Sequence, residues 1–160
     1  LTIEFRVDAL QLGAAALQLR WGTRKLSANV QAPIHPVPLS DVPTFSRLDP
    51  EKTITTASGL RYEVLEPSNG EKPGSTSVAT VHYTGWLEDG TVFDSTRGRV
   101  RAFPLDKIIP GWSEGVQLMP QGSRYKFHVP ADLAYGERGV PGRIPPNSPL
   151  IFEIHLISFQ

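Results

Sequence analysis

From residue 58 onward the chain alternates apolar and polar residues in short runs that end near glycine or proline. This pattern restricts the fold more than any other feature. In "SGLRYEVLE" (58–66) Leu60, Tyr62 and Val64 alternate with Arg61 and Glu63, which is typical of a strand with one buried face. Four further runs follow: "TSVATVHYTGWL" (76–87), "TVFDS" (91–95), "RYKFHV" (124–129) and "LIFEIHLISF" (150–159). Asp89-Gly90 suits a hairpin turn, because glycine supplies a positive φ angle. The pattern predicts an antiparallel sheet of about five strands.

One segment of this region has a helical period. In "GWSEGVQLM" (111–119), Trp112, Val116 and Met119 share one face, and Pro120 ends the pattern. A single short helix beside an antiparallel sheet defines an α+β domain. We find no internal repeat at the periods typical of solenoids or propellers.

The amino-acid composition of the chain changes near residue 55. Prolines are frequent before that point and favour extended backbone, because each one fixes φ and removes a hydrogen-bond donor. They stand at Pro33, Pro36, Pro38, Pro43 and Pro50. We therefore predict an extended N-terminal arm or linker over residues 1–55 and one folded domain over residues 56–160.

The first thirty residues support two interpretations. Ile3, Phe5 and Val7 alternate as in a strand, whereas Ala14, Leu17 and Trp21 are spaced as on one face of a helix, and we expect a short helix there. The segment is either a flexible extension or a docking arm that covers its apolar side chains on a partner.

Charge excludes several classes of partner. Sixteen basic residues balance sixteen acidic ones, so no overall field attracts the chain to nucleic acid, to anionic lipid or to acidic substrates. Arg97, Arg99 and Arg101 form a local basic cluster, but Glu88 and nearby aspartates precede it. We interpret the cluster as a solvated loop and not as a nucleic-acid site.

Two features bear on the cellular location. No run of eighteen apolar residues occurs, so we expect no transmembrane segment. The sequence starts at Leu1 and not at methionine, which favours a processed chain. On that ground we expect an organelle (mitochondrion or plastid) or the bacterial periplasm.

The common catalytic motifs are missing from the sequence. There is no phosphate-binding glycine loop, no nucleophile elbow and no cysteine, and the four histidines have no partners at metal-ligand spacing. His128 and His155 fit ordinary strand positions. We predict that the protein uses neither a metal nor a cofactor.

Aromatic and branched side chains are concentrated near the predicted loops. Any one of them alone fits an ordinary core. Two positions argue for a pocket: Trp112 begins the helix after "IIPG", and Tyr135 lies in the loop "DLAYGERG".

Three blocks of sequence resemble the FK506-binding-protein (FKBP) class of peptidyl-prolyl cis-trans isomerases, and most closely the macrophage infectivity potentiator (Mip) branch. They are "VHYTGWLEDGTVFDST", "IIPGWSEGVQLMPQGSRYKFHVPADLAYG" and "IPPNSPLIFEIHLI", and the resemblance covers about residues 56–159. It implies a five-stranded half-barrel sheet curled around the helix, with an apolar cleft between them.

The resemblance also implies which residues form the site. Trp112 corresponds to the floor on which the proline ring rests, and Tyr135 to a hydroxyl at the rim. The other residues implied in catalysis are Tyr83, Phe93, Asp94, Ile109 and Phe152. Phe103, Ile108 and Ile144 are implied to bind substrate, with Ile144 in a flap.

The implied function is isomerisation of X-Pro bonds in proline-containing polypeptides during protein folding, with macrolides of the tacrolimus and rapamycin type as inhibitors. The alternative is that the domain is a subunit docked into a larger protein complex through residues 1–55, with the isomerase activity secondary or lost. The apolar, proline-punctuated arm motivates this alternative, because free tails are usually more charged and less aromatic.

Overall fold

The computed structural model describes residues 18–21, 24–27 and 42–160. The chain divides into two compact units, Leu1–Pro36 and Val37–Gln160. In the first unit, strands β1 (Gln18–Trp21) and β2 (Arg24–Ser27) pair in antiparallel fashion.

The prediction of a short helix that includes Trp21 is therefore wrong for Gln18–Trp21, which form a strand. Polar and apolar residues alternate along Gln18–Trp21, and this two-residue period fits a strand better than a helix. The predicted positions Ala14 and Leu17, and the alternating Ile3, Phe5 and Val7, lie outside the described residues.

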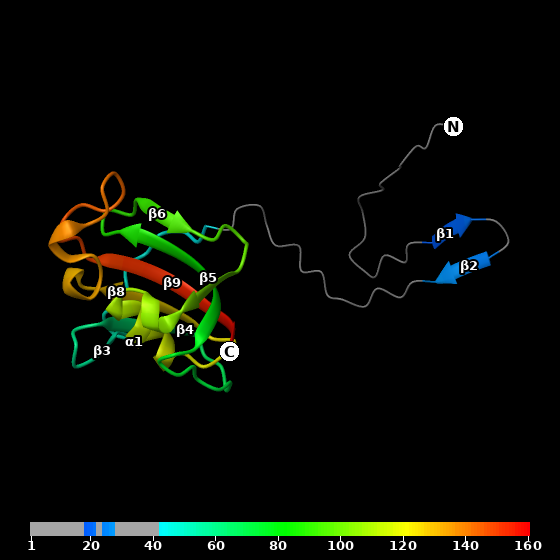
Figure 1. Cartoon of the computed structure of the whole chain (residues 1–160), viewed down its shortest axis with the longest axis horizontal. Helices are drawn as coiled ribbons and strands as arrows, with labels where there is room; N and C mark the ends of the chain where they lie inside the picture. Colours follow the sequence, from blue (N-terminus) through cyan, green and yellow to red (C-terminus); the bar gives the residue numbers. More distant parts are fainter. Residues whose placement is uncertain (1–17, 22–23, 28–41) are drawn as a thin grey trace. The chain divides into compact units, whose positions relative to one another are not determined.

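In the second unit a seven-stranded sheet carries the fold (Figure 1). Its strands are β3 (Ile54–Thr55), β4 (Arg61–Glu66), β5 (Val78–Leu87), β6 (Val92–Ser95), β7 (Arg101–Pro104), β8 (Arg124–Val129) and β9 (Leu150–Phe159). The order is β3-β4-β8-β9-β5-β6, β7 also pairs with β5, and all these pairs are antiparallel. The α+β class is confirmed, and five of the strands are those predicted. The short strands β3 and β7 were not expected, so the count of five is corrected to seven.

The predicted helix is α1 (Pro110–Leu118). Proline occupies its first turn, where the missing N–H costs no intrahelical hydrogen bond. The buried face contains Trp112, Gly115 and Val116. A Cβ atom at Gly115 would lie 2.7 Å from Cε1 of Phe127, so glycine permits the close packing of α1 on β8. Three short 3-10 helices complete the unit: η1 (Leu105–Lys107), η2 (Ala131–Leu133) and η3 (Gly136–Arg138).

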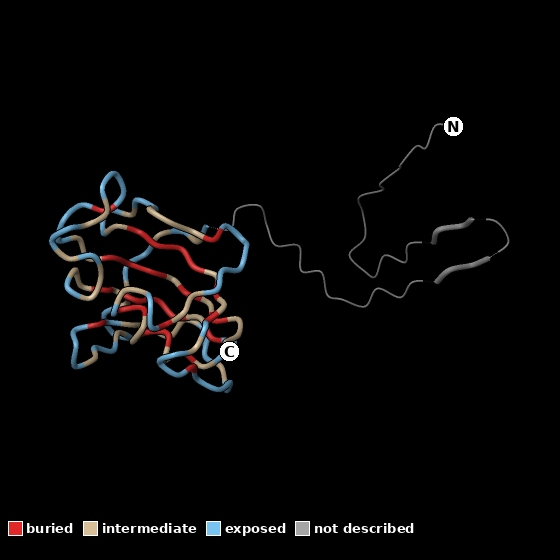
Figure 2. Tube along the Cα trace, in the orientation of Figure 1, coloured by how far each residue is buried: buried red, intermediate tan, exposed pale blue. Residues whose placement is uncertain are grey.

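The core lies between α1 and the sheet. Buried residues follow the long central strands β5 and β9, drawn in red in Figure 2. Val81, Val116, Phe127 and Leu156 are among the side chains with at most 1% of their surface exposed. This core fixes the helix against the sheet and so sets the positions of the aromatic residues around the start of α1.

Residues 42–53, which we call the strap, pack on the sheet ahead of β3. The Phe45 and Trp86 ring centroids are 6.1 Å apart. The backbone N–H of Asp49 donates to Oε2 of Glu63 over 3.0 Å, and Nζ of Lys126 donates to Oγ of Ser46 over 2.5 Å. These contacts cross the predicted boundary at residue 55. Residues of the strap therefore contribute contacts to the domain predicted over residues 56–160.

Candidate functional site

A cleft of about 530 Å³ opens where the start of α1 meets β5, β6, β7 and β9. Nine of the ten residues implied by the family resemblance line it. They are Tyr83, Phe93, Asp94, Phe103, Ile108, Ile109, Trp112, Tyr135 and Phe152. Because they come from strands, the helix start and a loop, the fold itself assembles the cleft.

Trp112 forms the centre of the aromatic cluster. Its ring is edge-on to three neighbours: Tyr83 at a centroid distance of 4.9 Å, Phe152 at 5.3 Å and Phe103 at 5.4 Å. Such edge-to-face pairs are a favoured arrangement of aromatic rings. Only 6% of the Trp112 surface is exposed, so its neighbours hold the ring in place.

A second aromatic pair forms one wall. Phe93 on β6 and Phe152 on β9 meet at 5.5 Å with an angle of 87° between the rings. Both pack beside β5, whose Gly85 lies opposite Phe152 in the sheet register. The wall therefore depends on three strands.

Polar groups cluster at one edge of the cleft. The Tyr83 hydroxyl donates to Oδ2 of Asp94 over 2.5 Å, and Nη1 of Arg101 lies 3.8 Å from the same oxygen. The backbone N–H of Ser95 donates to the other carboxylate oxygen over 2.9 Å. Burial and the hydrogen bond to Asp94 raise the pKa of Tyr83 well above its usual range. The phenol, which is protonated at neutral pH in any case, therefore keeps its proton and remains a donor further into the alkaline range.

Tyr135 lies at the rim, with 41% of its surface exposed. Burial of its hydroxyl end, with a smaller effect from the Asp94 charge, raises the pKa of Tyr135. Ile109 caps the N-terminus of α1, and Ile108 precedes it. These positions combine apolar surface with a hydroxyl and a backbone amide.

The structure places Ile144 elsewhere. It is buried in the core cluster, with 5% of its surface exposed, and lines a separate hollow that Val140 and Pro145 also line. Conversely, the cleft includes Arg101 and Lys107, which were not predicted. No local pattern points to Lys107, and Arg101 lies on strand β7, which the sequence pattern does not predict.

The chemistry that this site can support is limited by its residues. Among the described residues, no group of three histidine, cysteine, aspartate or glutamate side chains could hold a metal ion. No described helix is long and apolar enough to cross a membrane. The cleft offers an apolar floor and a few hydrogen-bonding groups at its edge. Such an arrangement defines a binding cleft for a small apolar ring attached to a polar backbone.

Comparison with known proteins identifies the class. Residues 69–157 match the family described as FKBP-type peptidyl-prolyl cis-trans isomerase. The chain therefore belongs to this family.

Two curated relatives are about half identical to the chain. The outer membrane protein MIP of Legionella longbeachae is 53% identical over 109 residues, which is 67% of this chain and 47% of the relative. An FKBP-type isomerase, FkpA of Aeromonas hydrophila, is 52% identical over 108 residues, which is 66% of this chain and 40% of the relative. The chain thus spans less than half the length of these relatives.

Solved structures agree with the fold. A crystal structure of a peptidyl-prolyl cis-trans isomerase from Pseudomonas syringae aligns with a TM-score of 0.66 and 37% identity. The alignment covers 68% of this chain and 81% of the Pseudomonas syringae chain. The crystal structure of FkpA from Escherichia coli gives the same TM-score with 42% identity, covering 69% of this chain and 52% of that chain.

Proposed function

We propose that the protein catalyses cis-trans isomerisation of X-Pro bonds in polypeptides and so assists their folding. The observation that carries this proposal is the Trp112 ring, held edge-on by three aromatic rings at the floor of an apolar cleft. Membership of the isomerase family supports the same reaction.

An apolar cleft can accelerate this reaction without a nucleophile or a metal. The barrier of about 18–20 kcal/mol comes from loss of amide resonance as the bond twists. The planar amide is more polar than the twisted one, so removing water disfavours the ground state relative to the transition state. A 10⁴-fold acceleration requires about 5.5 kcal/mol. Trp112, Phe103 and Phe152 supply the water-excluding surface.

The polar edge holds the peptide in the reactive orientation. We assign the Tyr135 hydroxyl and the Ile109 backbone N–H as donors to substrate carbonyl oxygens. Asp94 is fixed by its hydrogen bond from Tyr83 and lines the same cleft. Its carboxylate interacts with a carbonyl carbon of the bound peptide. Phe93 and Ile108 complete the walls, and Ile144 supports the flap from the core.

Macrolides of the tacrolimus and rapamycin type are proposed inhibitors, because they would present an apolar ring and flanking carbonyls to the same floor. Docking of residues 1–55 into a larger protein complex remains the alternative function. Comparing the native complex size of the full chain with that of a chain lacking residues 1–55 tests it, since an unchanged size excludes the anchor.

The test of the isomerase proposal uses the 160-residue chain and an Ala-Leu-Pro-Phe peptide. We expect the chain to accelerate isomerisation, and Trp112→Leu to reduce kcat/KM at least about tenfold. Trp86→Leu is the matched control, because Trp86 is also buried, with 1% of its surface exposed, but packs against the strap. Circular dichroism checks that both variants fold. If the unmodified chain shows no acceleration and no macrolide binding, the proposal is excluded.

A further inference from the structure

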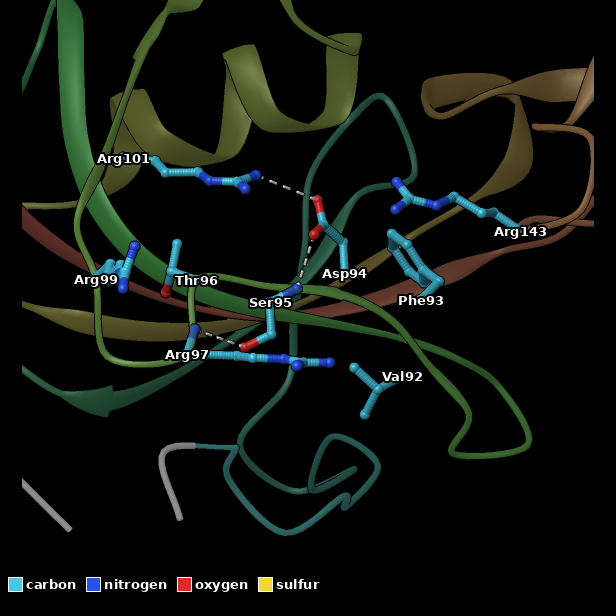
Figure 3. A pocket seen from close by; sticks show the side chains of 9 residues that line it. All are labelled: Val92, Phe93, Asp94, Ser95, Thr96, Arg97, Arg99, Arg101 and Arg143. Carbon is cyan, nitrogen blue, oxygen red and sulfur yellow. Dashed lines mark hydrogen bonds and ion pairs between the residues drawn. The ribbon is translucent and has the colours of Figure 1, made fainter. Parts of the chain in front are cut away.

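A second hollow, of about 540 Å³, adjoins the cleft and is lined mainly by charged and polar residues (Figure 3). Four arginines line it: Arg97, Arg99, Arg101 and Arg143. Asp94 is the single acidic residue among the described residues that line it. The hollow therefore carries an excess of positive charge on a chain that is neutral overall.

The fold assembles this cluster from two distant segments. Three of the arginines follow β6, and Arg143 comes from the turn Val140–Ile144, more than forty residues later. In that turn the N–H groups of Arg143 and Ile144 both donate to the carbonyl of Val140, at 2.9 Å each. The backbone that carries Arg143 is thus fixed next to the hollow, and Figure 3 shows its side chain beside Phe93 and Asp94.

The acidic residues that precede the cluster in sequence do not neutralise it. Glu88 pairs with Nε2 of His128 at 3.1 Å, and Asp89 accepts the backbone N–H of Thr91 at 2.8 Å. Neither lines the hollow. Asp94 lies 3.8 Å from Arg101 and is already bonded to Tyr83. Within residues 42–160, Arg97, Arg99 and Arg143 form no ion pair.

The turn that presents Arg97 has an uncommon backbone. Arg97 has φ of 46°, in the left-handed region that favours glycine or asparagine. The turn is closed by a hydrogen bond from the N–H of Arg99 to the carbonyl of Thr96, at 3.0 Å, and Oγ of Ser95 accepts the Arg97 N–H at 3.2 Å. These hydrogen bonds order the backbone of the turn, from which the exposed side chains of Arg97 and Arg99 line the hollow.

The hollow and the cleft are neighbours that share three residues. Phe93, Asp94 and Arg101 line both. An extended peptide advances about 3.3–3.6 Å per residue, so a side chain two or three residues from a bound proline would lie about 7–11 Å away. A residue at that separation is therefore the candidate to enter a hollow that shares lining residues with the cleft.

We propose that this arginine-lined hollow binds the carboxylate of a glutamate or aspartate two or three residues from the isomerised proline. This inference rests on the proposed isomerase function and specifies the substrate class. Guanidinium groups suit carboxylates because they offer paired N–H donors in a fixed plane. A polypeptide is favoured over nucleic acid, because the hollow adjoins a cleft for a peptide and the chain has no net positive charge.

The test compares peptides with the core Ala-Leu-Pro-Phe that carry Glu or its uncharged isostere Gln, two or three residues before or after the proline. Exchange NMR measures the catalysed isomerisation rate without a coupling protease, and fluorescence anisotropy measures binding. We expect about fivefold higher kcat/KM for the Glu peptide on at least one side, at low salt. The preference should shrink at about 0.5 M NaCl because salt screens exposed charges.

The variant Arg99→Gln/Arg143→Gln should abolish the preference and leave the rate with the Gln peptide unchanged. Lys52→Gln/Lys72→Gln is the matched control, because it also removes two positive charges, but from residues that line neither the hollow nor the cleft. This control should keep the preference.

The outcomes separate the two proposals. Equal rates and equal affinities for Glu and Gln peptides, with catalysis intact, would overturn the acidic specificity alone. Arginine-dependent binding of a labelled single-stranded oligonucleotide without a peptide preference would also overturn it. No catalysis of any peptide would exclude the isomerase function, and the anisotropy measurement would still decide whether the hollow selects a carboxylate.

Discussion

Tyr83 on β5 donates a 2.5 Å hydrogen bond to Asp94 on β6, eleven residues away along the chain. The same Tyr83 ring is edge-on to Trp112 at 4.9 Å. One side chain therefore joins the apolar floor of the cleft to its polar edge, and the raised pKa of Tyr83 extends its role as a donor into alkaline pH.

Replacing Tyr83 by phenylalanine removes the donor and keeps the ring. We expect the free energy of unfolding to fall by about 1–2 kcal/mol, because Asp94 loses a hydrogen bond in a half-buried site. Catalysis should fall as well, since Asp94 is no longer fixed. Urea denaturation and the peptide assay measure the two effects. Tyr62→Phe, at a hydroxyl outside the cleft, is the control, and equal losses in both variants would refute the assigned role.

Tyr135→Phe separates binding from stability. The residue is at the exposed rim, so unfolding should change little. If its hydroxyl donates one hydrogen bond to the ligand, macrolide binding should weaken by about 1 kcal/mol, roughly fivefold. Titration calorimetry measures the change, and an unchanged affinity would remove Tyr135 from the site.

The aromatic wall of the cleft depends on the absence of a side chain at Gly85. A Cβ atom there would lie 2.6 Å from Cζ of Phe93 and 2.9 Å from Cε1 of Phe152. We expect Gly85→Ala to displace both rings, to cost about 1–3 kcal/mol of stability and to reduce catalysis.

Gly115→Ala is the matched control, because its Cβ atom would meet Phe127 in the core, away from the cleft. Denaturation and peptide assays should show similar destabilisation in both variants, with catalysis lost in Gly85→Ala. Equal retention of catalysis would mean that the wall formed by Phe93 and Phe152 tolerates displacement.

Local patterns predicted the long elements of the domain. Strand β9 and helix α1 follow directly from period-two and helical spacing, because each element buries a face along its whole length. Two to four residues give no readable period, and β3 and β7 lack the hairpin signal Asp89-Gly90 that precedes the equally short β6, so the sequence does not predict them. Their pairing is set by neighbouring strands and not by their own residues.

The cleft residues were predicted through a family resemblance, whereas the arginine hollow was not predicted. Its basic cluster was visible at 97–101, but the nearby acids in the sequence suggested neutralisation. The ion pair between Glu88 and His128 and the position of Arg143 beside the hollow are tertiary contacts, and no local sequence pattern encodes them.

His155 predicts a dependence of stability on pH. Burial, with a smaller effect from the Arg124 charge, holds the pKa of His155 below its ordinary value of 6.5. As the pH falls through about 6.5, the unfolded chain binds a proton that the folded chain does not, so the free energy of unfolding decreases.

We expect His155→Gln to lose less stability than the unmodified chain between about pH 7.5 and pH 5.5. Urea midpoints at both pH values measure the difference. Burial raises the pKa of Glu153, but this group is present in both proteins and cancels in the comparison. Identical pH slopes would show that His155 titrates normally.

The strap predicts where the folded unit begins. A chain starting at residue 42 keeps the Phe45–Trp86 contact and the hydrogen bonds to Glu63 and Lys126, whereas a chain starting at residue 56 loses all three. We expect the free energy of unfolding of the shorter chain to be about 2–4 kcal/mol lower, because two buried charged groups, Glu63 and Lys126, also lose partners. Denaturant unfolding of both chains measures the difference, and Phe45→Ala in the longer chain isolates the aromatic part. Equal stability would instead support an independent domain over residues 56–160.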